Sequence, residues 1–263
     1  MRHTYWIVAI LLLVIGVFFS VSTGRANGPG RYNDFTFARV AYNGGGGGGG
    51  GWGWGRRGRS WAMDFPSADL NMIRALRLQT NLRVNEPQRI DLNDPEIFEI
   101  PFLYILEVGG LSMGNEESEN LREYLLRGGF MLVDDFHGSY QWSVFESEMN
   151  KVFPDRTIEE IPMDHPVFHC YYDFSEYPLV PGTAAMGGRG GWGGDGKYEA
   201  DGADFGHHCR GIFDDEGRLM VLINWNTDLG DGWEHAADQF YPRHYSENAY
   251  RLGINFAIYS MTH

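Results

Sequence analysis

The stretch "IPFLYILEVGGLSMGNEESENLREYLLRGGFMLVDDF", residues 100–136, decides the expected fold. It opens with an apolar run over residues 100–108, which is typical of a strand buried on both faces. The next segment predicts a helix, with Asn115 as its cap, acidic residues in its first turn and Gly128 as its terminator. A second apolar strand follows over 130–136. Strand, helix and strand in this order predict two parallel strands joined by a crossover.

The rest of the chain continues this alternation. A strand is expected over 35–42, a helix over 66–80 with Leu70, Ile73 and Leu76 on its apolar side, a helix over 140–153, a strand over 218–226, and a closing helix over 246–261 capped by Ser246. The predicted fold class is α/β, a three-layer sandwich with a mainly parallel sheet. Two Gly/Trp-rich loop insertions interrupt it, at 42–61 and 186–208. Residues 27–263 are expected to form a single domain.

The first 26 residues predict export. They combine a basic start at Arg2, an apolar run over 5–19 and small residues ending in Ala26. This layout is that of a signal peptide cleaved after Ala26. The alternative is an uncleaved N-terminal anchor, because the apolar run is near the lower length limit for spanning a bilayer. The rest of the chain would be periplasmic, or anchored to the inner membrane and facing the periplasm, with that segment as its only membrane contact.

The charge of the chain excludes one class of partner. It has 21 basic and 35 acidic residues, and without Arg2 and Arg25 the balance is 19 to 35, or −16. Nucleic acid is therefore not an expected partner. Cys170 and Cys209 could pair in an oxidising compartment or stay as two buried thiols, and the sequence leaves both alternatives open.

Four segments carry a resemblance to a known family: "FTFARVAYNGGG", "LREYLLRGGFMLVDD", "DHPVF" and "NWNTDLGDGW". In order and spacing they resemble the exported bacterial family called domain of unknown function 4159, for which no activity is established. The resemblance implies a flavodoxin-like fold of the class I glutamine amidotransferase type. In an amidotransferase, the turn after the central strand presents a cysteine nucleophile. This chain has Asp134, Asp135 and His137 there, so thiol-based glutamine hydrolysis is not expected.

Three residues are the candidate catalytic groups. Of Asp134 and Asp135, only one can face the ligand side of an extended strand, and Asp135 is the candidate, with His137 beside it as a base or metal ligand. His165 joins them from the "DHPVF" segment, where Pro166 favours an extended backbone. The alternative is that these residues cap helices and hold turns.

Other polar clusters leave the metal and cofactor questions open. His207, His208 and Cys209 are adjacent, but their spacing matches none of the recurrent zinc patterns. The segment after the 218–226 strand carries Asp228, Asp231 and His235 and resembles a calcium loop. It lacks the alternating oxygen ligands and the final glutamate that such a loop requires, so an Asx-rich turn is the alternative.

The glycine run, residues 44–51, is neither a P-loop nor a specific dinucleotide fingerprint. It should leave the carboxyl end of the first strand, where Tyr42, Val108 and Asp135 are expected to share one sheet edge. The candidate ligand-binding residues are the aromatic and basic ones of the two insertions: Trp52, Trp54, Arg56, Arg57, Arg189 and Trp192. They could bind a small anionic or carbohydrate ligand by stacking and charge. The alternative is low-complexity insertions without a ligand.

Two functions follow from these observations. The first is a non-enzymatic cell-envelope protein that binds a ligand or another envelope protein, because the cysteine nucleophile is missing and the insertions are long. The alternative is a hydrolase, with or without a metal, that acts on a carbohydrate or an amide through Asp135, His137 and His165.

Overall fold

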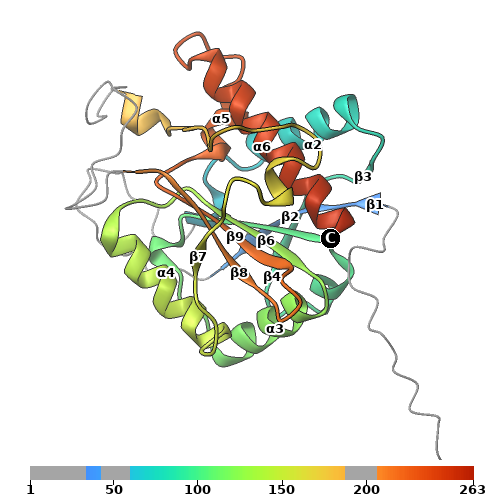
Figure 1. The fold of residues 1–263 in the computed structure, drawn as a ribbon, viewed down its shortest axis with the longest axis vertical. Coiled ribbons are helices and arrows are strands. Elements are labelled where there is room, and N and C mark those ends of the chain that lie inside the picture. Colours follow the sequence, from blue (N-terminus) through green and yellow to red (C-terminus); the bar gives the residue numbers. More distant parts are fainter. Residues whose placement is uncertain (1–33, 43–59, 187–205) are drawn as a thin grey trace, which may run out of the picture.

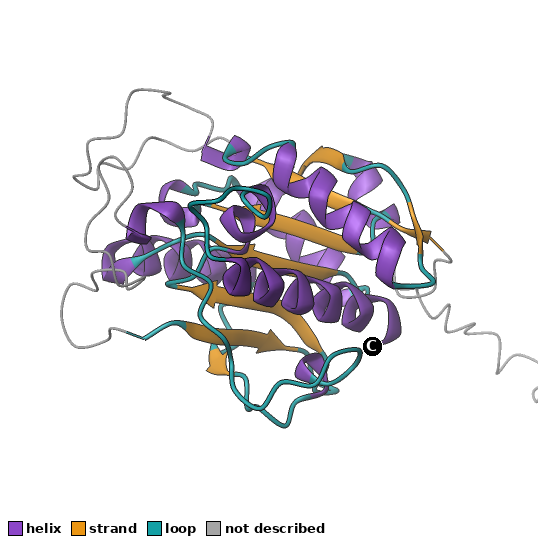
Figure 2. Cartoon of the chain, turned by 90° about the horizontal axis from the view of Figure 1, so that it is seen from above, coloured by secondary structure: helices purple, strands orange, loops and turns teal. Residues whose placement is uncertain are grey.

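The chain folds into three layers. In the computed structural model the described residues are 34–42, 60–186 and 206–263. Their seven-stranded sheet, in the order β4-β2-β5-β6-β9-β8-β7, lies between two layers of helices (Figures 1 and 2). Its strands are β2 (Phe37–Ala41), β4 (Gln88–Asp91), β5 (Phe102–Leu106), β6 (Phe130–Asp134), β7 (Glu159–Glu160), β8 (His208–Phe213) and β9 (Leu219–Trp225). The predicted α/β sandwich is confirmed.

Most of the sheet is parallel. Strands β4, β2, β5, β6 and β9 pair in parallel, so their carboxyl ends meet at one edge of the sheet, called here the carboxyl edge. Strand β8 is antiparallel to β9, and β7 is antiparallel to β8. The mainly parallel sheet was predicted, whereas this antiparallel side was not. The His and Arg residues of β8 hid its apolar alternation.

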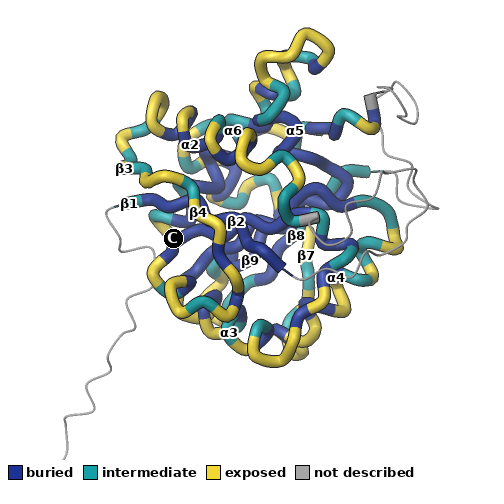
Figure 3. The backbone as a smooth tube through the Cα atoms, turned by 180° about the vertical axis from the view of Figure 1, so that it is seen from behind, coloured by how far each residue is buried: buried dark blue, intermediate teal, exposed yellow. Residues whose placement is uncertain are grey.

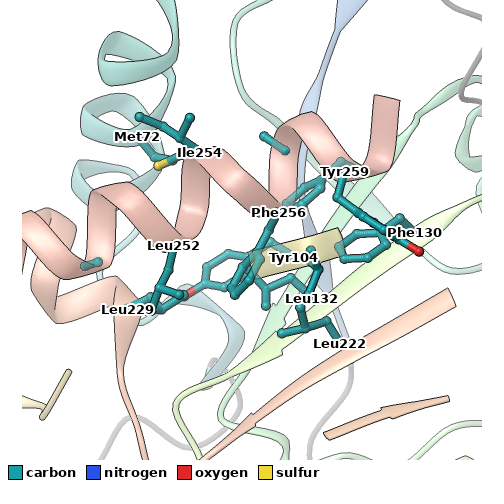
Figure 4. Close-up of a cluster of buried hydrophobic side chains, with 14 of the residues drawn as sticks. Met72, Tyr104, Phe130, Leu132, Leu222, Leu229, Leu252, Ile254, Phe256 and Tyr259 are labelled. Atoms are coloured by element: carbon teal, nitrogen blue, oxygen red, sulfur yellow. The ribbon is translucent and has the colours of Figure 1, made fainter. Parts of the chain in front are cut away.

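One face of the sheet is covered by α2 (Ser67–Gln79), α5 (Leu229–Glu234) and α6 (Arg243–Thr262). Phe102, Tyr104 and Leu106 of β5 point to this face, where they join a core that includes Leu229 and Phe256. Figure 4 shows Tyr104 among the apolar side chains under α6, close to Leu229. The start of α5 is therefore packed directly onto the central strands.

The opposite face is covered by α3 (Asn115–Leu126) and α4 (Gly138–Val152). Leu103 and Ile105, the alternate residues of β5, pack here against Leu125 of α3 and Phe145 of α4. The central strands β2, β5, β6 and β9 are buried throughout, whereas the edge strands β4 and β7 are largely exposed (Figure 3). A continuous apolar run is thus what a strand buried on both faces requires.

The helix boundaries correct three details of the sequence prediction. Gly114, not Asn115, caps α3, and its backbone N–H donates to the Glu117 carboxylate at 2.7 Å. Leu70 of α2 is 45% exposed and lies off the buried side. The last helix, α6, begins at Arg243 after Pro242, which places Ser246 inside it rather than at its cap. Pro242 fits a helix start because its fixed φ suits the first turn.

The remaining elements are short. The predicted strand over 35–42 divides at Thr36, and its first part, β1 (Asp34–Phe35), pairs with β3 (Arg83–Val84) in a separate two-stranded sheet. The 3-10 helices are η2 (Ser60–Ala62), η3 (Pro95–Glu99), η4 (Val108–Gly110), η5 (Pro166–Phe168) and η6 (Thr183–Met186). In the described part of the chain, no helix has the length and apolar character needed to cross a membrane.

Candidate functional site

Three neighbouring strands end in the same unusual turn. The residue after each of β5, β6 and β9 has a left-handed backbone, with φ of 55° at Glu107, 50° at Asp135 and 59° at Asn226. For residues other than glycine, this conformation costs about 1–3 kcal/mol and is concentrated at functional sites. The three turns place two carboxyl groups and an amide at the carboxyl edge, where ligands bind in open parallel sheets.

Hydrogen bonds tie these strand ends together. The backbone N–H of Glu107 donates to the carbonyl of Asp135 at 3.1 Å. The hydroxyl of Tyr42, just after β2, donates to the carbonyls of Leu106 at 2.9 Å and Glu107 at 2.7 Å. Tyr42, Val108 and Asp135 therefore share one sheet edge, as the sequence predicted.

Asp134, the last residue of β6, is a fully buried structural carboxylate. It accepts hydrogen bonds from the Tyr104 hydroxyl at 2.8 Å, the Asn224 amide at 3.3 Å, and the backbone N–H groups of Leu229 at 2.8 Å and Gly230 at 3.3 Å. Burial raises the pKa of Asp134 to about 6, although these hydrogen bonds oppose the rise. One side chain thus joins β5, β6 and β9 to the start of α5.

A buried ion pair positions the segment before α2. Arg39 in β2 binds both carboxylate oxygens of Asp69 in α2, and its guanidinium lies 4.5 Å from the centre of the Tyr104 ring. A third nitrogen of Arg39 donates to the carbonyl of Met63 at 3.1 Å. The next residue, Asp64, has a left-handed backbone with φ of 56°. Arg39 therefore holds the turn that presents Asp64.

Five carboxyl groups gather at the carboxyl edge: Asp64, Glu107, Asp135, Asp228 and Asp231, called here the edge carboxyl cluster. Burial, followed by repulsion from Asp231, raises the pKa of Asp64 to about 8 and that of Glu107 to about 7. The pKa values of Asp135 and Asp228 are also raised well above the ordinary range, by burial first and by neighbouring carboxylates second. Such shifts are typical of functional sites.

The cluster receives few compensating contacts. Asp228 accepts from the backbone N–H of Asp231 at 2.8 Å, and Asp231 accepts from that of Thr183 at 2.6 Å. Within residues 34–42, 60–186 and 206–263, no Lys or Arg forms an ion pair with any of the five carboxyl groups. Carboxyl groups gathered in this way favour protonation, a cation or a ligand with hydrogen-bond donors.

Asp135 and His137 form a pair. The Nε2 atom of His137 lies 3.2 Å from Oδ1 of Asp135. Burial lowers the pKa of His137 to about 3, so its imidazole is neutral at physiological pH. A carboxyl group with a raised pKa beside a neutral imidazole is an arrangement that can donate and accept protons. The structure thus brings together two of the three predicted catalytic residues.

His165 lies elsewhere. Its ring packs against Phe213, at 5.8 Å between centroids, and against Tyr259, at 5.5 Å. Phe213 pairs with Leu219, the first residue of β9, and so marks the edge of the sheet opposite the carboxyl edge. His165 accepts a hydrogen bond from the Val167 backbone and caps η5. The structure therefore gives His165 a local structural contact and does not join it to Asp135.

The other sequence candidates are dispersed or undescribed. The predicted ligand-binding residues lie outside the described residues: Trp52, Trp54, Arg56, Arg57, Arg189 and Trp192. His207 contacts the Tyr177 carbonyl and His208 contacts Glu160, so these adjacent side chains diverge. The thiols of Cys170 and Cys209 are free.

Sequence reasoning missed Asp64 and Glu107. Glu107 follows an apolar strand, as Asp135 does, and this shared position could have identified it. Asp64 carries no comparable pattern, because its place depends on the distant Arg39–Asp69 pair.

Comparison with known families identifies the domain. The model of the family described as "Domain of unknown function (DUF4159)" matches residues 36–261. The chain belongs to this family. The match spans every strand of the main sheet, so the edge carboxyl cluster lies within the DUF4159 domain. No curated protein matches the chain.

Neighbouring aspartates should respond differently to the same substitution. Asp134→Asn replaces one of the two acceptor oxygens with an amide NH2 group, which faces at least one of the present donors, so we expect a loss of about 1–3 kcal/mol in unfolding free energy. Asp135→Asn replaces a buried carboxyl group, which its neighbours disfavour when it is ionised, with a neutral amide, and Asn tolerates a left-handed backbone. Its unfolding midpoint should equal or exceed that of the wild type. Urea denaturation followed by circular dichroism measures both, and equal destabilisation by the two variants would contradict the assignment.

Stability should fall as pH rises from about 7 to about 9. The folded pKa values are about 8 for Asp64 and about 7 for Glu107, whereas unfolded carboxyl groups titrate near about 4. Over this range the folded chain therefore binds more protons than the unfolded chain. The contribution of these groups to the free energy of unfolding is complete below the unfolded pKa and is lost as pH rises through the folded pKa. His137 has a lowered pKa, so its protonation in the unfolded chain makes stability increase with pH, but only below about pH 6.5. A measurement that starts at about pH 7 avoids this contribution.

Thermal unfolding in a buffer with EDTA measures this slope. Asp64→Asn should reduce it, because one of the titrating groups is removed. If stability rises over this range, or if the slope is unchanged in the variant, the pKa values of these carboxyl groups are not raised in the folded chain.

Proposed function

We propose that this DUF4159 protein is an exported cell-envelope protein that binds a small hydroxyl-rich ligand, such as a carbohydrate, through the edge carboxyl cluster. The observation that carries the proposal is the gathering of Asp64, Glu107, Asp135, Asp228 and Asp231 at the carboxyl ends of parallel strands. The proposal of export rests on the sequence of residues 1–26, and the ligand-binding proposal is independent of it.

The arrangement is unfavourable for stability, which supports a functional origin. Buried carboxyl groups without counter-charges destabilise a fold, and left-handed backbone at Asp64, Glu107 and Asp135 adds strain. Neutral or apolar residues at these positions would give a more stable domain. Proteins retain such conflicts mainly where binding or catalysis requires them.

The charge of the cluster selects among ligands. Carboxylates accept hydrogen bonds from hydroxyl and ammonium groups and repel anions. The net charge of −14 adds to this repulsion. Of the two ligand classes expected from the sequence, the described residues therefore favour a carbohydrate over an anion.

A hydrolase is the second candidate, and the Asp135–His137 pair favours it. Asp135 follows β6 in a strained strand-to-helix turn, which resembles the turn that presents the nucleophile in α/β hydrolases. This turn also supports an amidotransferase-like fold in which Asp135 replaces the cysteine. In such an enzyme Asp135 would act on the substrate, and His137 would exchange the proton.

Three pyranoses that differ in charge test the binding proposal. Glucosamine, glucose and glucuronic acid carry positive, neutral and negative charge at neutral pH, and titration calorimetry of the purified protein compares them. We expect glucosamine and glucose to bind at least about tenfold more tightly than glucuronate, a difference of about 1.4 kcal/mol. Asp135→Asn should weaken both.

The matched control is Asp173→Asn, which makes the same replacement of a carboxyl group by an amide in a side chain that is 91% exposed. It should leave the affinities unchanged. The proposal fails if glucuronate binds most tightly, if neither glucosamine nor glucose binds, or if Asp135→Asn has no more effect than the control.

A further inference from the structure

Helix α5 carries a set of metal-ligating side chains on one side. Asp231, Glu234 and His235 are spaced i, i+3 and i+4, and the backbone N–H of His235 donates to the Asp231 carbonyl at 2.9 Å, so helical geometry extends to His235. This spacing puts all three side chains on one helix face. One ligand atom from each lies within 4.8 Å of the other two.

The imidazole is oriented as in a metal site. Its Nδ1 atom lies 2.7 Å from a carboxylate oxygen of Asp238, and this hydrogen bond assigns the proton to Nδ1. The ring is further held by Phe240, at 5.1 Å between centroids. A histidine that donates one N–H to a carboxylate presents the other nitrogen to a metal in many metalloproteins. Asp238 therefore directs the Nε2 lone pair of His235 at Asp231 and Glu234.

The distances from Nε2 fit two ligands of one ion better than hydrogen bonds. They are 3.4 Å to Oδ1 of Asp231 and 3.7 Å to Oε2 of Glu234. Hydrogen bonds between nitrogen and oxygen are shorter, at about 2.7–3.2 Å. Two atoms bound to one zinc ion at about 2.0–2.2 Å are separated by roughly 3.3–3.6 Å in tetrahedral geometry, which matches the distance to Asp231 and is slightly shorter than that to Glu234. A lone pair facing two carboxylates is repulsive, and either a proton on Nε2 or a metal ion between the ligands removes this repulsion.

A second observation concerns the inner side of Asp231. Ligand oxygens of Asp64, Asp228 and Asp231 also lie within 4.8 Å of one another. The Oδ2 atom of Asp64 is buried and has no hydrogen-bond partner among the described residues. A Cβ at Gly230 would lie 2.5 Å from this oxygen, so the close approach of Asp64 depends on glycine there. An enclosed carboxyl oxygen without a partner is costly, and either a proton or a cation would satisfy it.

We propose that Asp231, Glu234 and His235 bind a divalent transition-metal ion of the zinc class, with Asp64 beside the ion and a coordination position left open. An imidazole with two carboxylates suits zinc, whereas magnesium and calcium prefer oxygen ligands alone. Glu234 and His235 are half-buried, which leaves the ion a path from solvent. The site adjoins the edge carboxyl cluster through Asp231, and it goes beyond the proposed function because it does not require a carbohydrate ligand.

Zinc titration of the purified, EDTA-treated protein against a competing chelator tests the proposal. One zinc ion per chain should bind, and cobalt in its place should give the intense visible absorption of a four-coordinate site. We expect His235→Ala to weaken zinc binding more than a hundredfold, and Asp238→Asn to weaken it about tenfold through loss of imidazole orientation. Magnesium and calcium should not compete at equal concentration.

The matched control is His169→Ala. His169 also bonds a carboxylate four residues away, Asp173, but its second nitrogen contacts the Met163 carbonyl at 2.7 Å. This variant should bind zinc as the wild type does. Glu234→Gln supplies a second variant should His235→Ala fail to fold. Zinc binding that survives both His235→Ala and Glu234→Gln, equal loss in the control, or absence of zinc binding to the wild type would overturn the proposal.

Discussion

The carboxylate of Asp134 is the interaction on which the carboxyl edge depends. It is fully buried, and its four hydrogen-bond donors come from β5, β9 and the first turn of α5. Helix α5 and its N-cap carry Asp228, Asp231 and Glu234, so the same carboxylate fixes where these acidic groups lie. The Arg39–Asp69 pair plays the corresponding part for Asp64. Both contacts bury charge, and both satisfy it with hydrogen bonds that only this arrangement of strands can supply.

Asp134 and Asp135 are neighbours in sequence with opposite surroundings. The first is surrounded by donors and holds the fold together, whereas the side chain of the second has His137 as its one hydrogen-bonding partner among the described residues. The strained turns at Glu107 and Asp135 persist because the parallel strands on either side over-determine them. A donor-rich ligand and a metal ion would each relieve the repulsion at this edge from a different side, the ligand at Asp135 and the ion at Asp231.

Sequence reasoning recovered what local patterns encode. The apolar runs of β5 and β6, the helix between them and the Gly128 terminator, which has φ of 106°, follow from burial and capping, and they fixed both the fold class and the edge of Tyr42, Val108 and Asp135. The strand β8 was missed because polar residues interrupt its alternation. Only part of the edge carboxyl cluster was predicted. Asp64 is positioned by the contact between Arg39 and Asp69, which are 30 residues apart in the sequence, and no local pattern indicates such a contact. His165 was drawn into the site by its motif, although its contacts lie at the other edge.

The central claim is that the fold holds carboxyl groups together without counter-charges from the described residues, and titration of their side-chain carbon resonances by NMR tests it most directly. Spectra of isotope-labelled protein in EDTA would be followed with pH, and Asp64→Asn and Glu107→Gln would assign two of the signals. The account predicts midpoints near about 8 for Asp64 and about 7 for Glu107. Midpoints below about 5 for both residues, as in exposed carboxyl groups, would show that the edge is solvated and dispersed, and would contradict the account.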